Sequence, residues 1–525
     1  MNLALVVSEF IDRARSLYGS ELAVTCGSVQ LTYRALAERI DRLSGGLAGL
    51  GVKRGDVVAY VSFNCHRLLE GYYAVPQIGA VLLPINIRLK PHEIEYILAD
   101  AGASVVIVDR ALTALIAPIA SRLPALRRVV LMGDAPADPA LDGDDYEQLL
   151  SSAPPSFARP ELQESDLAEL FYTSGTTAQP KGVMLTQRQL YLHALHCLMS
   201  LFLDDTTVLL HSIPLFHVNG WGSPHFITLV GGRHVMLARF DPAQVLATIE
   251  RERVTLIFLV PTMAHALASD PSWPTRDLRS LKRVMLGGAA ASPSLLRALD
   301  ERLPDCLVTC GYGLSETSPV LTIANVKRGG ATTIDGSRAV RSTAGLPIPG
   351  ARIELMDDDG ALLPHDGAST GEIVVRSNWV MDGYWRQPEA SAGALAHGWF
   401  HTGDVGSIDA DGYVHIVDRK KDIIITGGEN VPSIEIEKAI YEHAAVAECA
   451  VIAAPDERWG EIPLAIVFLR PDARADEAEI IEHCKRVLAN FKVPRRVVFA
   501  DAPLPKGGTG KILKRELRDR YLKSL

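Results

Sequence analysis

The chain has 525 residues, of which 48% are hydrophobic and 22% are charged. This length and composition predict at least two packed domains, and they exclude a disordered, collagen-like or small disulfide-scaffold protein. The 62 Asp and Glu residues outnumber the 53 Lys and Arg residues, so a net charge of −9 without a basic run argues against a nucleic-acid partner.

The first residues lack a basic segment ahead of their apolar run, and no apolar stretch in the sequence reaches the length of a membrane span. Seven scattered cysteines indicate free thiols in a reducing compartment rather than a disulfide framework. We therefore expect a cytoplasmic protein with no integral membrane segment.

Short apolar runs alternate with longer segments of helical period before residue 310. The predicted strands are residues 57–61, 104–108, 207–211, 254–260 and 283–286, and the predicted helices are 187–200, 242–251 and 293–303. Asp241 and Ser292 fit the N-caps of the last two helices. This alternation predicts an α/β architecture with mostly parallel sheets covered by helices.

Residues 171–182 (FYTSGTTAQPKG) follow a predicted strand at 167–171 and precede a predicted helix. Their glycines, hydroxyls and single lysine suit a polyphosphate, because backbone amides can approach it and side chains can share its charge. The segment is not a Walker A loop, since Gly182 follows the lysine and Pro180 precedes it. A G-x-G-x-x-G turn near the N-terminus is also missing, so a P-loop NTPase and a Rossmann dehydrogenase lose their main support.

After Gly350 the sequence pattern changes from long helical segments to short runs separated by turn residues. Turn pairs at 358–360, 366–367, 382–383 and 411–412 separate short alternating runs, which predicts a small antiparallel β unit. The charged residues 418–422 then precede a compact α+β module with helices at 433–443 and 477–489 and strands at 446–453, 464–468 and 496–499. We place the main domain boundary inside 418–422.

Several segments, in order, resemble the motifs of the adenylate-forming superfamily, which includes acyl-CoA synthetases, luciferases and peptide-synthetase adenylation domains. The matching segments are 172–182, 214–221 (PLFHVNGW), 287–289, 311–316 (GYGLSE), 402–404, 418–422, 427–430 and 505–511. In these motifs the chain is most similar to medium- and long-chain fatty acyl-CoA synthetases. The resemblance implies that ATP and a carboxylic acid form an acyl-AMP, and that coenzyme A then displaces AMP to give a thioester.

The resemblance also implies a domain plan. Residues 1–418 are expected to form the large adenylation core, 419–422 a hinge, and 423–525 a small mobile α+β domain that carries the closing lysine. Lys421 matches the hinge position, where a change in φ and ψ would rotate the small domain between the two half-reactions.

Roles for individual residues follow from the same resemblance. The expected nucleotide site consists of Thr173, Ser174, Gly175, Thr176, Thr177, Lys181, Gly288, Ala289, Gly311, Tyr312, Gly313, Ser315, Asp404 and Arg419. Tyr312 would stack on adenine and Asp404 would accept hydrogen bonds from both ribose hydroxyls. Thr176 and Glu316 are the expected Mg²⁺ ligands, because a hard cation that bridges phosphates prefers oxygen.

The acid and the thiol are expected on other segments. The predicted substrate-binding residues are His217, Asn219, Gly220, Trp221, Gly287, Gly427 and Gly428. The expected catalytic set is Lys511, Glu316, His217 and Lys421, and Lys511 would offset the charge that builds on the α-phosphate and carboxylate oxygens.

Local residues alone leave alternatives open. Tyr312 and His217 also suit core positions, and Asp404 and Lys511 beside glycine also suit exposed turns. The acid can be a fatty chain or an aryl ring, since both pockets use the same residue types. The acceptor can be coenzyme A or, alternatively, a carrier-protein thiol, an amine or a hydroxyl. A nucleotide-binding regulator without activity is disfavoured by the retained Lys511 and Glu316, and a homodimer is allowed.

Overall fold

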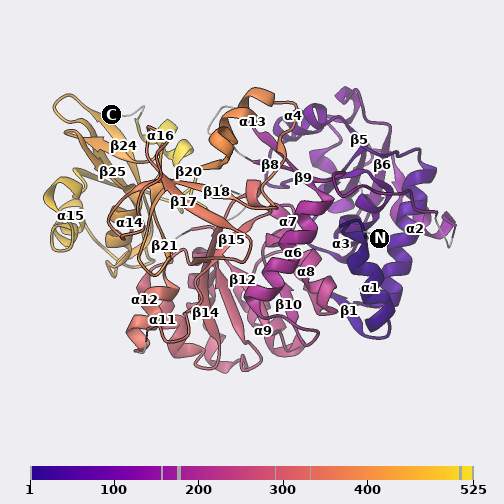
Figure 1. Ribbon diagram of the computed structural model, residues 1–525, viewed down its shortest axis with the longest axis horizontal. Helices are drawn as coiled ribbons and strands as arrows, with labels where there is room; N and C mark the ends of the chain where they lie inside the picture. Colours follow the sequence, from indigo (N-terminus) through magenta and orange to yellow (C-terminus); the bar gives the residue numbers. More distant parts are fainter. Residues whose placement is uncertain are drawn as a thin grey trace.

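The computed structural model describes residues 3–136, 138–154, 158–173, 179–289, 291–331, 333–507 and 511–522, with Val218 and Asn219 described by their backbone only. N-terminal residues, in indigo, lie at one end of the molecule, and C-terminal residues, in yellow, lie at the other (Figure 1). Within the described residues the strands form two large sheets, a small antiparallel sheet and a separate C-terminal sheet. The same residues contain no helix that is long and apolar enough to cross a membrane.

The first large sheet has the strand order β19-β9-β8-β4-β3-β5-β6-β7. Its strands are β3 (Val57–Val61), β4 (Val81–Pro84), β5 (Ala103–Asp109), β6 (Arg128–Met132), β7 (Asp144–Asp145), β8 (Leu167–Thr173), β9 (Lys181–Thr186) and β19 (Gly383–Tyr384). Neighbours from β8 to β7 run parallel, whereas β9 and β19 are antiparallel to their neighbours. Val58 and Tyr60 enter one apolar cluster and Val57 and Ala59 another, so both faces of β3 are buried, and its sequence is continuously apolar.

The second large sheet has the order β16-β15-β14-β13-β12-β10-β11-β1-β2. Its strands are β1 (Leu22–Cys26), β2 (Val29–Thr32), β10 (Val208–His211), β11 (Arg233–Met236), β12 (Leu256–Leu259), β13 (Arg283–Leu286), β14 (Leu307–Gly313), β15 (Val320–Ile323) and β16 (Leu346–Pro347). The strands from β1 to β14 pair in parallel. The glycine-rich segments after β13 and at the end of β14 therefore meet at the same edge of the sheet, where open α/β sheets bind ligands.

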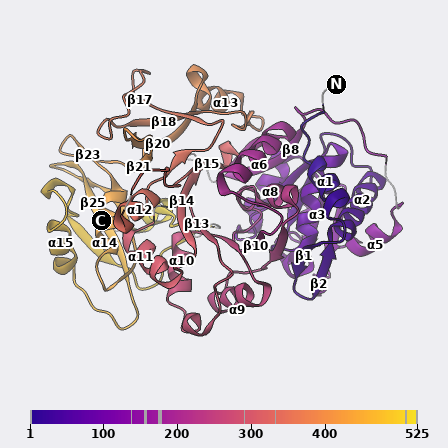
Figure 2. The same cartoon turned by 60° about the horizontal axis from the view of Figure 1, so that its bottom comes forward.

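Helices cover and separate the two large sheets. They are α1 (Ser8–Tyr18), α2 (Tyr33–Gly49), α3 (His66–Ala74), α4 (Pro91–Ala101), α5 (Tyr146–Ser152), α6 (Gln187–Leu201), α7 (Val218–Trp221), α8 (Ser223–Val230), α9 (Pro242–Glu252), α10 (Pro261–Ala268), α11 (Pro293–Arg302), α12 (Ile334–Arg341) and α13 (Pro388–Ala394). The packed pair α6 and α8 lies between β8 and β10 (Figure 2). Asp241 and Ser292 accept hydrogen bonds from backbone amides in the first turns of α9 and α11, which confirms both predicted N-caps.

The predicted antiparallel unit is present as the sheet β17-β18-β20-β21. Its strands are β17 (Arg352–Met356), β18 (Gly371–Arg376), β20 (Phe400–Ile408) and β21 (Val414–Arg419). The expectation for residues 382–383 was wrong, because Gly383 begins β19 and pairs with β9 of the first large sheet instead of forming a turn in this unit.

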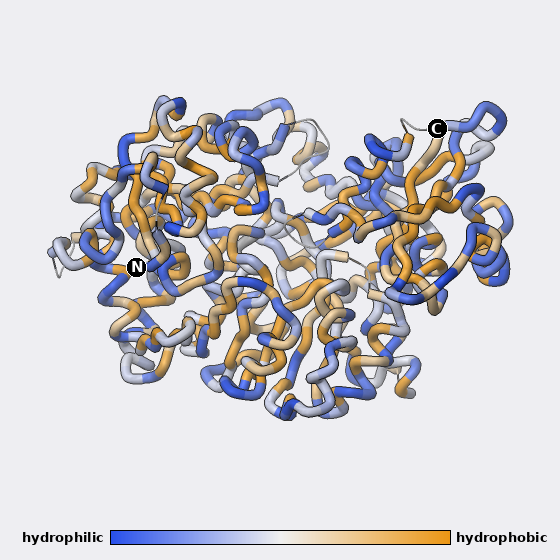
Figure 3. Tube along the Cα trace, turned by 180° about the vertical axis from the view of Figure 1, so that it is seen from behind, coloured by the Kyte–Doolittle hydropathy of each residue, from blue (hydrophilic) through white to orange (hydrophobic). Residues whose placement is uncertain are grey.

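The C-terminal part has a core of its own. It contains β22 (Ile424–Thr426), β23 (Glu429–Val431), β24 (Val446–Asp456), β25 (Gly460–Leu469), β26 (Arg496–Phe499), α14 (Ser433–Tyr441), α15 (Glu477–Lys485) and α16 (Lys514–Tyr521). Alternate residues of β24 and β25 enter two apolar clusters on the two faces of their sheet. Figure 3 shows apolar segments, in orange, running through this part separately from those of the larger part. The predicted α/β fold with a smaller α+β domain is confirmed.

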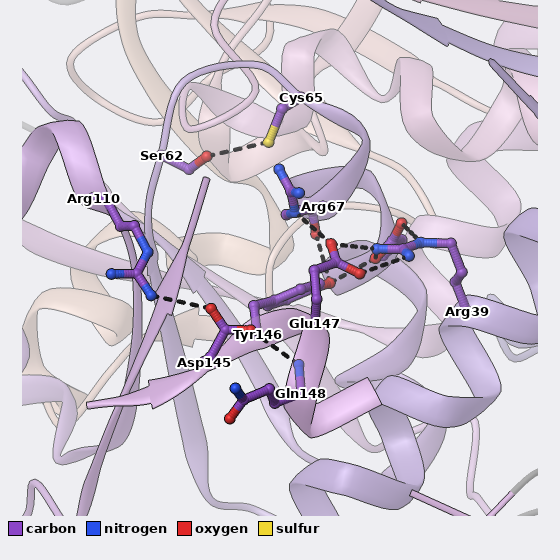
Figure 4. A network of polar contacts seen from close by, with 10 residues as sticks. Arg39, Ser62, Cys65, Arg67, Arg110, Asp145, Tyr146, Glu147 and Gln148 are labelled. Carbon is purple, nitrogen blue, oxygen red and sulfur yellow. Dashed lines mark hydrogen bonds and ion pairs between the residues drawn. The ribbon is translucent and has the colours of Figure 1, made fainter. Parts of the chain in front are cut away.

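A partly buried polar network ties α2, α3 and α5 together near the N-terminus (Figure 4). The Glu70 side chain is fully buried, with its Oε1 atom 2.6 Å from Arg39 Nε. The Tyr146 hydroxyl donates to Glu70 Oε2 at 2.7 Å. Glu147 pairs with Arg39 at 2.9 Å and with Arg67 at 2.8 Å. Every charge in this network therefore has an opposite charge as a partner.

Candidate active site

Thr173 and Lys181 form the base of the predicted phosphate loop. They are paired residues of the antiparallel strands β8 and β9. The predicted phosphate-binding residues Ser174, Gly175, Thr176 and Thr177 lie outside the described residues. The expected strand–loop–helix order needs a correction, since β9 comes between the loop and α6 and returns the chain along β8.

Asp404, Arg419 and Tyr312 form a compact polar cluster. Asp404 and Arg419 face each other across β20 and β21, and Arg419 Nε lies 3.0 Å from Asp404 Oδ1. Tyr312, on β14, donates its hydroxyl to Asp404 Oδ2 at 2.7 Å. Burial and the Asp404 charge raise the pKa of Tyr312, so its hydroxyl stays a donor. Because an ionised carboxylate has about four acceptor positions, Asp404 retains capacity for the hydroxyls of a ribose.

Glu316 lies in a short 3₁₀ turn, Ser315–Thr317, directly after β14. Its Oε1 atom accepts a hydrogen bond from the Tyr384 hydroxyl at 3.0 Å. Burial raises the pKa of Glu316, against the hydrogen bond from Tyr384 and the charge of Arg419. Among the described residues no three His, Cys, Asp or Glu side chains gather as a self-contained metal site. A lone carboxylate fits Mg²⁺, which commonly binds one or two carboxylates together with substrate phosphates.

Lys511 comes from the C-terminal part but lies against the glycine segment after β13. Its Cε atom is 3.4 Å from the position that a Cβ on Gly288 would take. Burial and the nearby Arg419 lower the pKa of Lys511 to about 8, while Asp404 and Glu316 act in the opposite direction.

The lysines on either side of Lys511 behave differently. Lys506 pairs with Glu448, and Lys514 lies 2.8 Å from Glu437. In the described part of the chain no ion pair involves Lys511. Of these three lysines, Lys511 is thus the one without an ion pair among the described residues.

Small residues around this cluster leave room for a flat ligand. A Cβ on Gly313 would lie 1.7 Å from the Pro319 carbonyl oxygen, so this position requires glycine. Gly288 and Ala289 are exposed, and Gly287, Gly311 and Ser315 complete the same two segments beside Tyr312. The structure therefore brings the predicted adenine segments together with Asp404 and Lys511.

The predicted acid segment lies against Gly287. Trp221 has a positive φ of 66° between two glycines and stacks on Phe258 with ring centroids 5.6 Å apart. A Cβ on Gly287 would lie 2.8 Å from the Trp221 ring. Burial and the charge of Lys511 lower the pKa of His217 to about 3, so this imidazole is neutral near pH 7. Gly220 lies in the same turn with a φ of 53°, and only the backbone of Asn219 is described, within α7.

Gly427 and Gly428 are not part of this cluster. They form the exposed two-residue turn between β22 and β23, with φ values of 59° and 87°. The Gly427 amide donates to the Trp459 carbonyl within the C-terminal part. Lys421 lies in the turn between β21 and β22, where the predicted hinge was placed.

The sequence did not single out two residues that the structure places at this site. Tyr384 donates to Glu316, and its ring centroid lies 4.9 Å from Lys181 Nζ. Arg88 donates to the Gly507 carbonyl at 3.0 Å and so links the large part to the loop before Lys511. An aromatic residue after glycine was a weak signal for Tyr384, and no local pattern distinguished Arg88 from other surface arginines.

Comparisons with known proteins give matches over most of the chain. The family model described as "AMP-binding enzyme" matches residues 11–385, and the model described as "AMP-binding enzyme C-terminal domain" matches residues 435–511. The second match ends at Lys511.

Curated relatives match along nearly the whole chain. A feruloyl-CoA synthase from an Amycolatopsis species is 40% identical over 95% of this chain and 96% of that protein. A long-chain-fatty-acid–CoA ligase from Thermus thermophilus is 38% identical over 99% of this chain and 96% of that protein. Among solved structures, the anthranilate CoA ligase AuaEII in complex with anthranoyl-AMP has a TM-score of 0.90 and 27% identity, and the match covers 100% of this chain and 98% of that one.

Proposed function

Because this chain belongs to the AMP-binding enzyme family and is an AMP-forming acid–thiol ligase, we propose that it joins an aryl or a medium- or long-chain carboxylic acid to coenzyme A at the cluster around Lys511. The observation that carries this assignment is the position of Lys511. Its side chain lies against Gly288 and within electrostatic reach of Asp404 and Glu316, and it forms no ion pair with a described residue.

The chemistry explains why the acid must be activated with ATP. A carboxylate is a poor electrophile, because its charge is delocalised and oxide is a poor leaving group. Attack of the carboxylate on the α-phosphate of ATP releases pyrophosphate and gives an acyl-AMP, whose AMP is a stabilised leaving group. The thiol of coenzyme A then attacks the acyl carbon, a thioester forms and AMP leaves.

The residues of the site divide this work. Asp404 would accept the ribose hydroxyls, with Arg419 and Tyr312 holding its carboxylate in place. Lys511 would donate to the α-phosphate and carboxylate oxygens, where negative charge builds during adenylation. Glu316, with Thr176 from the loop outside the described residues, would hold Mg²⁺. The cation would supply charge neutralisation between the phosphates of ATP.

The acid would lie along the Trp221 face. Trp221 stacks on Phe258 and lies against Gly287, which gives this face an apolar, aromatic lining suited to an aryl ring or an alkyl chain. The neutral His217 can donate or accept a hydrogen bond near the reacting carboxylate without adding a second cation beside Lys511. Gly427 and Gly428 would approach only after the C-terminal domain, residues 423–525, rotates about Lys421, and their missing side chains would leave room for the thiol arm.

Two further expectations stay predictions. A cytoplasmic location is supported by the seven cysteines, all of which are free thiols in the described residues. A homodimer is compatible with the chain, and its test is the molar mass in solution.

A pyrophosphate-release assay tests the proposal. Fatty, aryl, thioether and amino-substituted acids are supplied with MgATP, with and without coenzyme A, and products are identified by mass. We expect acyl-CoA from aryl or fatty acids. Formation of an amide or ester without any acyl-CoA would instead assign a non-CoA acceptor, and absence of ATP–pyrophosphate exchange with every acid would refute adenylation.

A further inference from the structure

Residues 381–385 connect the two halves of the proposed triphosphate site. The Trp385 amide donates to the Gly182 carbonyl at 2.7 Å, one residue after Lys181. The Met381 amide donates to the Glu316 carbonyl at 2.8 Å. The segment therefore has backbone hydrogen bonds at one end to the phosphate-loop strand β9 and at the other to the turn that carries Glu316.

Tyr384 is the side chain that this segment places between the two. Its ring lies under the Lys181 ammonium, with the centroid 4.9 Å from Nζ. Its hydroxyl donates to Glu316 Oε1 at 3.0 Å. Lys181 and Glu316 have opposite charges and form no ion pair with each other in the described residues, and Tyr384 contacts both of them.

Such an arrangement has a clear consequence for ligands. In a direct ion pair, Lys181 and Glu316 would bind each other. The pair would then compete with phosphate for Lys181 and with the cation for Glu316. The ring stabilises the ammonium through its π face and leaves the N–H donors free to turn towards phosphate. A single hydroxyl donor occupies one oxygen of Glu316 and fixes the plane of the carboxylate, as partners of metal-binding carboxylates do.

We propose that Tyr384 is a positioning residue that holds Lys181 for phosphate and Glu316 for Mg²⁺ while keeping them from pairing with each other. This inference rests on the proposed function. It adds a residue outside the predicted site set and assigns separate tasks to the two ends of one side chain. Its edge strand fixes the placement, because Tyr384 pairs with Val183 in register.

Two substitutions separate the contribution of the Tyr384 ring from that of its hydroxyl. Tyr384→Phe keeps the ring over Lys181 and removes the hydroxyl from Glu316, whereas Tyr384→Leu removes both contacts. Tyr413 supplies a matched control, since Lys327 Nζ lies 5.7 Å from its ring centroid and its hydroxyl donates to the Asn325 carbonyl at 3.1 Å. Tyr413→Phe makes the same chemical change at a cation–tyrosine pair outside the proposed site.

Binding of the α,β-methylene analogue of ATP is measured by calorimetry, in EDTA and across a Mg²⁺ titration. For Tyr384→Phe we expect unchanged affinity in EDTA and a Mg²⁺ midpoint raised about 10-fold, the usual cost of losing a partner of a metal ligand. For Tyr384→Leu we expect the same rise and, in addition, weaker binding in EDTA. Tyr413→Phe should change neither quantity.

Two outcomes would overturn the inference. One is a Mg²⁺ midpoint in Tyr384→Phe equal to that of the wild type. The other is an equal loss of affinity with and without Mg²⁺, which a general structural role would produce. Failure of the proposed function is recognised separately, because the wild-type protein would then show neither binding of the analogue nor ATP–pyrophosphate exchange.

Discussion

Two polar clusters in this molecule are built from similar residues, but their charged side chains are paired to different extents. The N-terminal network of Figure 4 combines arginines, glutamates and a tyrosine hydroxyl, and Glu70 and Glu147 are each matched by arginine. The cluster around Asp404 also has an arginine and a tyrosine hydroxyl. Lys511 adds a further cation there, and no carboxylate among the described residues pairs with it.

This difference is the one expected between a structural cluster and a binding cluster. Burying an unpaired charge costs stability, so a cluster that only supports the fold should balance its charges internally. The pKa of Lys511 is lowered because burial and the neighbouring Arg419 both make its charged form less stable. A polyphosphate would give Lys511 the ionic partner that it lacks among the described residues, and the comparison therefore predicts opposite effects of mutation in the two clusters.

The largest effect is expected for Lys511→Ala. Removing a charged donor aimed at the reacting oxygens should lower the adenylation rate on the order of 1,000-fold. Thioester formation from supplied acyl-AMP should stay within a few-fold of wild type, because Lys511 is assigned to the first half-reaction only. ATP–pyrophosphate exchange and release of coenzyme-A thioester measure the two steps.

Lys485→Ala is the control for that experiment. Lys485 belongs to α15 of the same C-terminal part, and half of its side chain is exposed beside Glu482. Its substitution should leave both half-reactions unchanged. Equal losses of both steps in Lys511→Ala would contradict the assigned role.

Asp404→Asn should produce the next largest effect. The amide keeps the shape of the side chain but cannot balance Arg419 or accept as strongly from ribose. Hydrogen bonds to a charged group contribute about 1.5–3 kcal/mol, so the KM for ATP should rise roughly 10- to 100-fold. A loss of unfolding free energy with an unchanged KM would place Asp404 with the structural network instead.

Glu70→Gln tests the other cluster, the N-terminal network, where we expect an effect on stability and not on ATP binding. Glu70 is fully buried but Arg39 is partly exposed and keeps Glu147, so we expect the free energy of unfolding to fall by about 2 kcal/mol. The KM for ATP should stay within twofold of wild type. Urea denaturation followed by tryptophan fluorescence gives the first quantity, and exchange kinetics give the second. If Glu70→Gln raised the KM for ATP without changing the free energy of unfolding, the two clusters could no longer be divided into a structural and a binding one.

The residues of the proposed binding cluster were easier to single out from the sequence than those of the Glu70 network. Asp404, Lys511 and Tyr312 lie in short glycine-rich motifs, whose composition reports a local backbone requirement and whose order matched a known superfamily. The Glu70 network joins three helices through contacts between distant residues, and each member alone is typical of an amphipathic helix surface. Its pairing depends on tertiary packing, which local patterns do not encode.

Tyr384 illustrates the same limit inside the active site. Residues 382–383 carry the composition of a turn, and the prediction of a turn was wrong because the strand β9 offers unpaired backbone groups at the edge of the first large sheet. That pairing, together with the hydrogen bond from the Met381 amide to the Glu316 carbonyl, brings Tyr384 to Lys181 and Glu316. The domain boundary and the roles of individual site residues stay predictions until the variants are measured.

The smallest predicted effect concerns pH. Lys511 acts as a cation, and its pKa is lowered to about 8, so its active form is present below that pH and is lost above it. The kcat/KM for ATP in the exchange reaction, which reports the free enzyme, should therefore fall with rising pH from about 8 and approach a tenfold loss per pH unit. Lys511→Arg keeps its charge throughout this range, and its residual activity should lack the descending limb. The same limb in Lys511→Arg and in wild type would assign the titration to another group, whereas its loss in Lys511→Arg alone would tie the charge of Lys511 to catalysis.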